Sequence, residues 1–562
     1  PAQYGDRFAA VLNVGTRAYD GASAARADVE MGSLATVDST FGYHARVGTS
    51  GSLSVAGRFG QNSRGIDPPV PDYTHNASSD VAQFLRYSTP LHGDDTLNFD
   101  LIHSLQSFQI PPDTANGVPP STDDDEYQDD LFTSLQYRHD INSHGSLSFG
   151  PSFKRSHIVD TNDLANDLAG ASGPCTDFSD CSFFSVYANR VAQDVRFNAD
   201  YDLRSLNHDL RAGMLYGLTA VDKRYVITLQ PFSQLNPNGT FTVTDSSPNT
   251  AHQQEAYVQY TWRLDHAYQL DYGVRADAFE IGSDGFKSGF AQMSPRIKLT
   301  RIFSARAAVY AYFGRLFVPF SFENVSPATG ASLYVAAHRP DRTFDLRPQR
   351  DSLYEAGAHA PFGRGDLGLR ISHKVSTDYI DDTQVGSTNL HQDINFPQGR
   401  VDIQSLTYED PLVQNGRLTL SLTHGLAVTS ANCETQLLQN CAASGPAGGP
   451  WVQADHDQRW SANAGLLMNE IRGGWFAANI EYGSGLSTDP GNCANGSTVN
   501  CKVPPHLTLD AEKGFALGRK LNAAIVVKNV FDDRYALTMN NSLQGTHYAQ
   551  PRYVGVRLSV SP

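Results

Sequence analysis

The chain closes with the stretch PRYVGVRLSVSP, residues 551–562, and the spacing of its side chains decides the fold. Alternate positions are aliphatic, namely Val554, Val556, Leu558 and Val560. The positions between them are small or polar, namely Gly555, Arg557 and Ser559. Because successive side chains of a β-strand point to opposite faces, this stretch predicts a strand with one apolar and one polar face. The apolar face can cover a soluble core or contact lipid, and the rest of the chain distinguishes these two cases.

The same two-residue period recurs along the whole chain. It is clear in GSLSVAGRF (51–59), DTLNFDL (95–101), DVRFNADY (194–201) and GRLTLSLTH (416–424). The polar face of these segments carries charged residues, so it faces water or a polar lumen. From residue 23 onward we count 22 such segments, and almost no helical period competes with them. The chain is therefore predicted to be all-β.

The connections between these segments alternate between short and long. Those after even-numbered strands are tight, for example VGTSG, LHGDD, INSHG, RSLNH and FGRG. Those after odd-numbered strands are mostly long, at 60–78, 108–126, 158–184, 223–250, 317–346, 376–398, 426–457, 483–505 and 536–551. Such alternation puts all long loops at one end of a barrel, which is typical of bacterial outer-membrane proteins. The predicted fold is a 22-stranded antiparallel transmembrane up-and-down β-barrel with short periplasmic turns and long extracellular loops, and Val554 and its aliphatic neighbours face lipid.

Composition agrees with this assignment. The 562 residues include 43 Lys and Arg against 59 Asp and Glu, which gives a formal charge of 43 − 59 = −16. An acidic chain with a pI near 5.5 is a poor candidate for nucleic-acid binding. The mean hydropathy is −0.36, and no apolar run approaches the roughly 18 residues of a membrane helix. Helical membrane proteins are thereby excluded, whereas a barrel of alternating strands is not.

Six cysteines form three close pairs, each within a predicted long loop. The gaps of five, seven and seven residues do not match the ligand spacing of a zinc site. Free thiols of a cytosolic protein are the alternative, but local pairs in an exported chain are most simply disulfides. We predict the pairs Cys175–Cys181, Cys433–Cys441 and Cys493–Cys501.

Several ordered segments resemble one known family. The stretch VVKNVFDDRYAL (526–537) resembles the Asn-Leu-Phe-Asp-x-x-Tyr signature near the end of TonB-dependent receptors, with Asn529, Phe531, Asp532 and Tyr535 at the matching positions. Upstream, a Gly-x-Arg-x-Asp element at Gly273, Arg275 and Asp277, then MSPRIKL (293–299) and LRPQRDSLYEAG (346–357), resemble further segments of the family in the same order.

The resemblance implies an outer-membrane receptor whose barrel surrounds a plug domain coupled to TonB. Residues 1–22 resemble the last plug strand and the linker into the barrel, and residues 23–562 resemble the barrel. We therefore expect the bacterial outer membrane as the location, with lipid and lipopolysaccharide as surroundings. Most of the plug, and with it the TonB contact, is expected to be missing from this chain, which begins at Pro1 and reads as processed or cut. Pro562 stands where the family usually has an aromatic residue.

Two loops hold candidate ligand groups. The run STDDDEYQDD suggests Ca²⁺ binding through Asp123, Asp124, Asp125 and Glu126, since hard cations take carboxylate oxygens. The alternative is a solvated acidic loop. The run HRPDRTFDLRPQR gathers Arg339, Arg342 and Arg350, whose guanidinium groups suit an anionic siderophore. The alternative is local pairing with Asp341 and Asp345.

The expected function is active uptake of a scarce nutrient, such as a siderophore-bound iron, a cobalamin-like cofactor or a carbohydrate. Extracellular loops would bind this small-molecule ligand, and TonB would drive its release inward. We find no catalytic motif, so no enzyme activity and no organic cofactor are expected. The rival hypotheses are a plugless passive channel and a barrel whose loops only bind partners at the cell surface.

Overall fold

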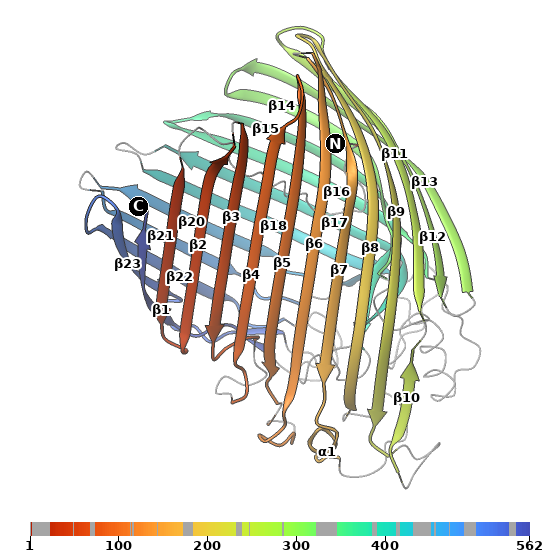
Figure 1. Ribbon diagram of the computed structural model, residues 1–562, viewed down its shortest axis with the longest axis vertical. Helices are drawn as coiled ribbons and strands as arrows, with labels where there is room; N and C mark the ends of the chain where they lie inside the picture. The colour runs from red at the N-terminus through yellow and green to blue at the C-terminus, as the bar shows by residue number, and fades with distance from the viewer. Residues whose placement is uncertain are drawn as a thin grey trace.

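The computed structural model describes the chain except at certain positions. These are residues 1, 3–22, 49, 68–73, 113, 115–116, 143, 172–183, 232–238, 247, 284–285, 322–345, 385–390, 412–415, 431–450, 455–456, 471–472, 488–501, 539–546 and 562. Figure 1 shows the described strands wrapped into one tilted barrel. No helix among the described residues is long and apolar enough to cross a membrane.

The described part of the chain forms a closed antiparallel barrel of 22 strands. They are β1 (Ala24–Gly32), β2 (Thr36–Val47), β3 (Gly51–Asn62), β4 (Ser78–Pro90), β5 (Asp95–Ile110), β6 (Asp124–Asn142), β7 (Gly145–Thr161), β8 (Phe184–Arg204), β9 (His208–Leu229), β11 (Asn249–Arg263), β12 (Tyr268–Ser283), β13 (Phe286–Ser304), β14 (Ala307–Val318), β15 (Gln349–Phe362), β16 (Gly365–Gln384), β17 (His391–Asp410), β18 (Arg417–Ser430), β20 (Trp460–Asn469), β21 (Trp475–Gly483), β22 (His506–Ala516), β23 (Leu521–Lys528) and β26 (Tyr553–Val560).

The barrel closes where its last strand meets its first. β26 pairs antiparallel with β1 from Ala27↔Val560 to Gly32↔Gly555, and on its other side it pairs with β23. Closure leaves no open sheet edge. An open edge would expose unpaired backbone N–H and C=O groups to the hydrocarbon of the membrane, which is energetically costly. Smaller elements lie outside the ring: β10 (Phe241–Asp245) continues beside β9, β19 (Trp451–Gln453) pairs with β18, β24 (Ala536–Thr538) pairs with β25 (His547–Tyr548), and α1 covers Leu164–Asp167.

The predicted alternation of short and long connections is confirmed. At one end the shortest turns are 143–144, 305–306 and 363–364, and the longest has six residues, 411–416. At the other end lie all connections longer than six residues, among them 63–77, 162–183, 230–248 and 319–348, together with the short connections 33–35 and 284–285. This long-loop end is at the bottom of Figure 1, where β10 and α1 are labelled.

One predicted loop is wrong. Residues 376–398 were expected to connect two strands, but β16 and β17 remain paired from Thr377↔Gln398 out to Gln384↔His391. The segment is mostly polar, and its few apolar residues, among them Ile380 and Phe396, are too sparse to give a long apolar alternation. The hydrogen bonds of a β-ladder join backbone groups, so two strands can stay paired beyond the membrane even where neither has an apolar face.

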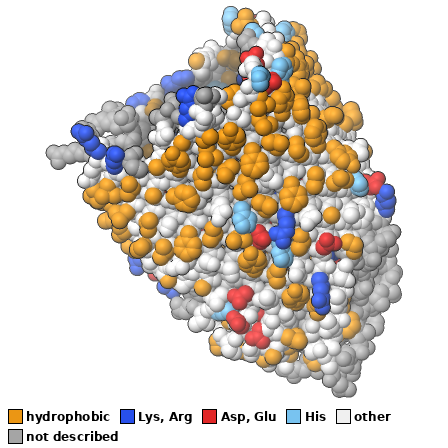
Figure 2. All heavy atoms as spheres, viewed as in Figure 1, with side chains coloured by type: hydrophobic (Ala, Val, Ile, Leu, Met, Phe, Trp, Pro, Cys, Tyr) orange, Lys and Arg blue, Asp and Glu red, His pale blue; other side chains and the backbone are white. Residues whose placement is uncertain are grey.

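The side chains of β26 face as predicted. Val554, Val556, Leu558 and Val560 are between 41% and 51% exposed. On the opposite parity Arg557 forms ion pairs with Glu30 on the adjacent strand β1 and with Glu512 on β22, the second strand on its other side. Figure 2 shows hydrophobic side chains spread over the outer surface of the wall. The aliphatic face therefore contacts lipid, and the polar face lines the lumen.

Candidate functional site in the barrel lumen

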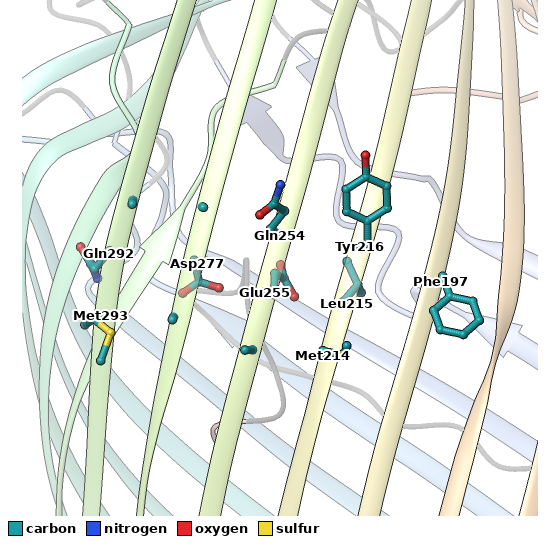
Figure 3. Close-up of a pocket in the computed structure, with 13 residues that line it drawn as sticks. Phe197, Met214, Leu215, Tyr216, Gln254, Glu255, Asp277, Gln292 and Met293 are labelled. Atoms are coloured by element: carbon teal, nitrogen blue, oxygen red, sulfur yellow. The ribbon is translucent and has the colours of Figure 1, made fainter.

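A groove of about 620 Å³ lies on the wall across β8, β9, β11, β12 and β13 (Figure 3). Its rim carries the exposed side chains of Phe197, Met214, Tyr216 and Met293, which belong to the lipid-facing parity of their strands. Alanines 256, 276, 278 and 291 lie between them. Because this groove opens toward lipid, it is not a candidate site for a nutrient in transit.

The opposite side of the same wall carries a buried ionic network. Arg275 lies on β12 and forms ion pairs with Glu255 of β11 and, at 2.6 Å from Nε to Oδ1, with Asp277. Arg275, Glu255 and Asp277 are only 3%, 8% and 6% exposed. Gln253 adds a hydrogen bond from Nε2 to Oε1 of Glu255 at 2.5 Å. Two carboxylates thus share one guanidinium group on the lumen face.

The strand register explains this grouping. Glu255 and Asp277 are direct cross-strand partners in the β11–β12 hairpin. Like charges placed opposite each other destabilise a sheet, so the pair requires a cation nearby. Arg275 lies two residues from Asp277 and therefore on the same face. The sequence motif identified Arg275 and Asp277 but missed Glu255, although folding the hairpin about its tight turn would have paired Glu255 with Asp277.

The network also holds the start of the chain. Nη1 of Arg275 donates to the backbone carbonyl of Ala2 at 3.3 Å, and the backbone nitrogen of Ala2 donates to Oε1 of Gln259 at 2.6 Å. Ala2 is 1% exposed. Arg275 and Gln259 therefore bind both backbone polar groups of a residue 273 and 257 positions away along the chain. The lumen wall therefore holds Ala2 in place through two hydrogen bonds.

Toward the long-loop end the lumen side becomes apolar and tightly packed. A buried cluster comprises Ala251, Phe279, Ile281, Phe317 and Phe320. Phe279 and Phe320 meet edge to face, with ring centroids 5.9 Å apart. The cluster is followed along the wall by the buried pair Lys374–Asp351, whose charged atoms are 3.7 Å apart. This end of the lumen wall therefore has a packed aromatic cluster close to a buried ion pair.

The predicted arginine cluster is only partly placed. Arg339 and Arg342 lie outside the described residues. Arg350 belongs to β15, in register with Phe317 and Thr377. Its neighbours Gln349 and Asp351, which point to the other side of the strand, are the buried ones. The grouping of these three arginines as a ligand site stays a prediction.

The predicted acidic site divides into separate parts. Asp123 and Asp125 lie beside His75, whereas Asp124 points away from them and is buried. Glu126 accepts a hydrogen bond from Nε2 of Gln128 at 2.5 Å. The sequence missed His75 because it belongs to a different extracellular connection.

The predicted disulfides also stay predictions, since all six cysteines lie outside the described residues. They are Cys175, Cys181, Cys433, Cys441, Cys493 and Cys501. Each nevertheless falls in a connection at the long-loop end, as expected.

The family-like motif after β23 has a structural role. Asn529 adopts a positive φ of 48°, and its Nδ2 donates to the carbonyls of Asp533 and Gln550 at 3.0 and 2.9 Å. Its Oδ1 accepts from the backbone nitrogen of Asp533 at 3.0 Å. Tyr535 stacks on His506 with centroids 3.9 Å apart. The motif fixes both ends of the last extracellular connection beside the closing seam.

Substituting Asn529 tests this role. Asn529→Ala removes three hydrogen bonds and places alanine at positive φ, so it is expected to destabilise this connection by about 2–3 kcal/mol. Limited proteolysis should then cleave the connection between β23 and β26 faster than in the unmodified protein. Phe531→Ala changes an exposed motif residue and should leave the cleavage rate nearly unchanged. Equal rates for the two variants would contradict the assigned role of Asn529.

Residues 63–530 match the family described as "TonB dependent receptor-like, beta-barrel". The chain belongs to the TonB-dependent receptor family. Members of this family are bacterial outer-membrane proteins, so the long-loop end of the barrel is extracellular and the short turns are periplasmic. No curated protein matches the sequence.

Solved TonB-dependent receptors have the same fold. The ferric yersiniabactin uptake receptor FyuA from Yersinia pestis superposes with a TM-score of 0.72 at 11% identity, covering 97% of this chain and 81% of that one. The siderophore receptor PiuA from Acinetobacter baumannii gives 0.69 at 12%, covering 97% and 82%. The ferric citrate transporter FecA, unliganded, gives 0.71 at 14%, covering 97% and 80%. At such low identity these likenesses establish the barrel and leave the ligand of this receptor open.

Proposed function

We propose that this receptor takes up a ferric siderophore or a similar iron chelate by TonB-driven transport. Family membership supports uptake of a nutrient across the outer membrane. The solved receptors of the same fold that bind ferric yersiniabactin and ferric citrate favour iron as the cargo. The observation that carries the proposal is the binding of Ala2 inside the lumen by Arg275 and Gln259.

That contact is what a gated transporter needs and a passive pore does not. A barrel of 22 strands has a lumen too wide for wall side chains to fill. If residues 1–22 are the last plug strand and linker, then the Arg275 network anchors the gate to the wall. Displacing the plug would then require breaking this contact, so transport would require an input of energy. A chelate would first bind at the extracellular end, near the aromatic cluster around Phe279.

Uptake measurements test the proposal directly. Cells that lack the receptor should lose accumulation of one labelled ferric chelate from a panel of catecholate, hydroxamate and citrate types, and the complementing gene should restore it. Because transport depends on TonB, removing TonB should abolish accumulation while ligand binding to intact cells persists. Labelled cobalamin and a labelled oligosaccharide, tested in the same cells, serve as alternative cargoes.

The rival functions give different results. A passive channel would conduct steadily in planar bilayers and would support uptake without TonB. A surface-binding barrel would show no uptake defect for any compound of the panel. Either result would contradict active iron uptake.

A further inference from the structure

Three extracellular connections meet beside the extracellular end of β6. The connection 63–77 contributes His75, the start of β6 contributes Asp124, and the connection after β7 contributes Asp163 and Asp167, the latter as the last residue of α1. Figure 2 shows a group of acidic side chains with a histidine near the long-loop end of the wall. These elements are far apart in sequence, and only the barrel brings them together.

Two of these carboxyl groups form a buried pair. Asp124 and Asp167 are 8% and 4% exposed, and their carboxyl groups lie within hydrogen-bonding reach of each other. Oδ1 of Asp124 accepts from the backbone nitrogen of Asp163 at 2.7 Å. Oδ2 of Asp167 accepts from the hydroxyl of Ser185, which in turn accepts from Nδ2 of Asn162 at 2.6 Å. The hydrogen bonds from Asp163 and Ser185 therefore hold both carboxyl groups in position.

The pair lacks a compensating charge. Within the described part of the chain, no lysine or arginine forms an ion pair with Asp124 or Asp167, and Oδ1 of Asp167 is buried without a hydrogen-bond partner. Burying an unpaired carboxylate costs several kcal/mol, and two in contact repel each other as well. The site must therefore hold a proton or a cation.

More exposed acids lie beside the pair, close to His75. Oδ1 of Asp123 and Oδ1 of Asp125 lie 3.5 and 3.9 Å from Nε2 of His75. The same Nε2 is 3.0 Å from the backbone oxygen of Asp124. A contact with a carbonyl requires Nε2 to carry a proton, and a protonated nitrogen cannot bind a metal. In this structure Nε2 of His75 is therefore a donor that orients the loop.

We propose that Asp124 and Asp167 bind a Ca²⁺ ion that joins the extracellular connections after β5 and β7. The donors offered are carboxylate oxygens, which suit a hard cation, and Ca²⁺ accepts irregular coordination more readily than Mg²⁺. Asp163 borders the site and adds negative charge, while water completes the coordination shell. The ion neutralises the buried pair and occupies the unpartnered Oδ1 of Asp167. This inference is independent of the transported substrate.

Binding of Ca²⁺ alone to the full chain in detergent tests the proposal. Calorimetric titration should give one site with a Kd of about 0.1–1 mM, the range of extracellular Ca²⁺ modules. The unfolding temperature of the protein should be higher in Ca²⁺ than in EGTA. Mg²⁺ at the same concentration should produce a clearly smaller shift. Absence of any Ca²⁺ binding by the unmodified protein would overturn the proposal and leave a shared proton as the neutralising species.

Matched variants locate the ion. Asp124→Asn and Asp167→Asn should each weaken Ca²⁺ binding at least about tenfold, since each removes a charged ligand. Asp123→Asn removes the same charge from an adjacent residue that is mostly exposed, and it should change the affinity by less than about threefold. Outer-membrane insertion and heat-modifiable gel mobility confirm that each variant is folded. If Asp123→Asn weakens binding as much as Asp167→Asn, the ion lies in the exposed cluster instead.

Discussion

Replacing Arg275 by methionine is expected to lower the free energy of unfolding of the barrel by about 3–5 kcal/mol. The substitution leaves Glu255 and Asp277 buried opposite each other with their shared cation removed. It also removes the donor to the carbonyl of Ala2. Unfolding in urea, followed by the heat-modifiable gel mobility of the purified protein, measures the loss.

Two controls separate charge burial from lost packing. Arg301→Met removes an exposed arginine of the adjacent strand β13, which lies over the ring of Tyr268, and should cost less than about 1 kcal/mol. The triple variant Glu255→Gln, Arg275→Met, Asp277→Asn removes all three charges and should recover most of the stability. If Arg275→Met is no more destabilising than Arg301→Met, the network does not have the energetic role assigned to it.

Placing a charge on the lipid face of the closing strand is expected to have the second largest effect. Val556 is 51% exposed on the outer surface and lies between Met31 and Ile525 of the neighbouring strands. Val556→Arg should destabilise the barrel by about 2–4 kcal/mol, because an arginine near the middle of the bilayer must leave water. Reversible unfolding of the protein from lipid vesicles gives this number.

The same substitution on the other face of β26 provides the comparison. Ser559 faces the lumen, and its hydroxyl bonds to Asp28. An arginine at that position can pair with Asp28 in a polar environment, so Ser559→Arg should cost much less than Val556→Arg. A reversed order would mean that the two faces of the strand have been assigned the wrong way round.

The sequence determined the fold because the fold follows from a local property. Every strand carries its own two-residue period, and turn lengths are visible without any knowledge of packing. Two local patterns therefore sufficed to predict a barrel of 22 strands. They are the alternation of apolar and polar side chains, as at Val554, Val556, Leu558 and Val560, and the alternation of short and long connections. The continued pairing of β16 and β17 within the expected loop 376–398 was missed, because backbone hydrogen bonds maintain it where apolar residues are too few to show a clear period.

The sites could not be obtained in the same way, because they depend on which distant residues the closed barrel brings together. Asp124 was visible as one member of an acidic run, but its partner Asp167 comes from another connection 43 positions further along the chain. Arg275 stood in a recognisable motif, yet its contact with Ala2 exists only because Ala2 lies inside the lumen. Alternation along a strand sets which face a side chain occupies, whereas strand register and barrel closure set its neighbours. The sequence alone therefore specified a membrane barrel, and the tertiary structure decided which of its charges are buried, paired or left to bind an ion.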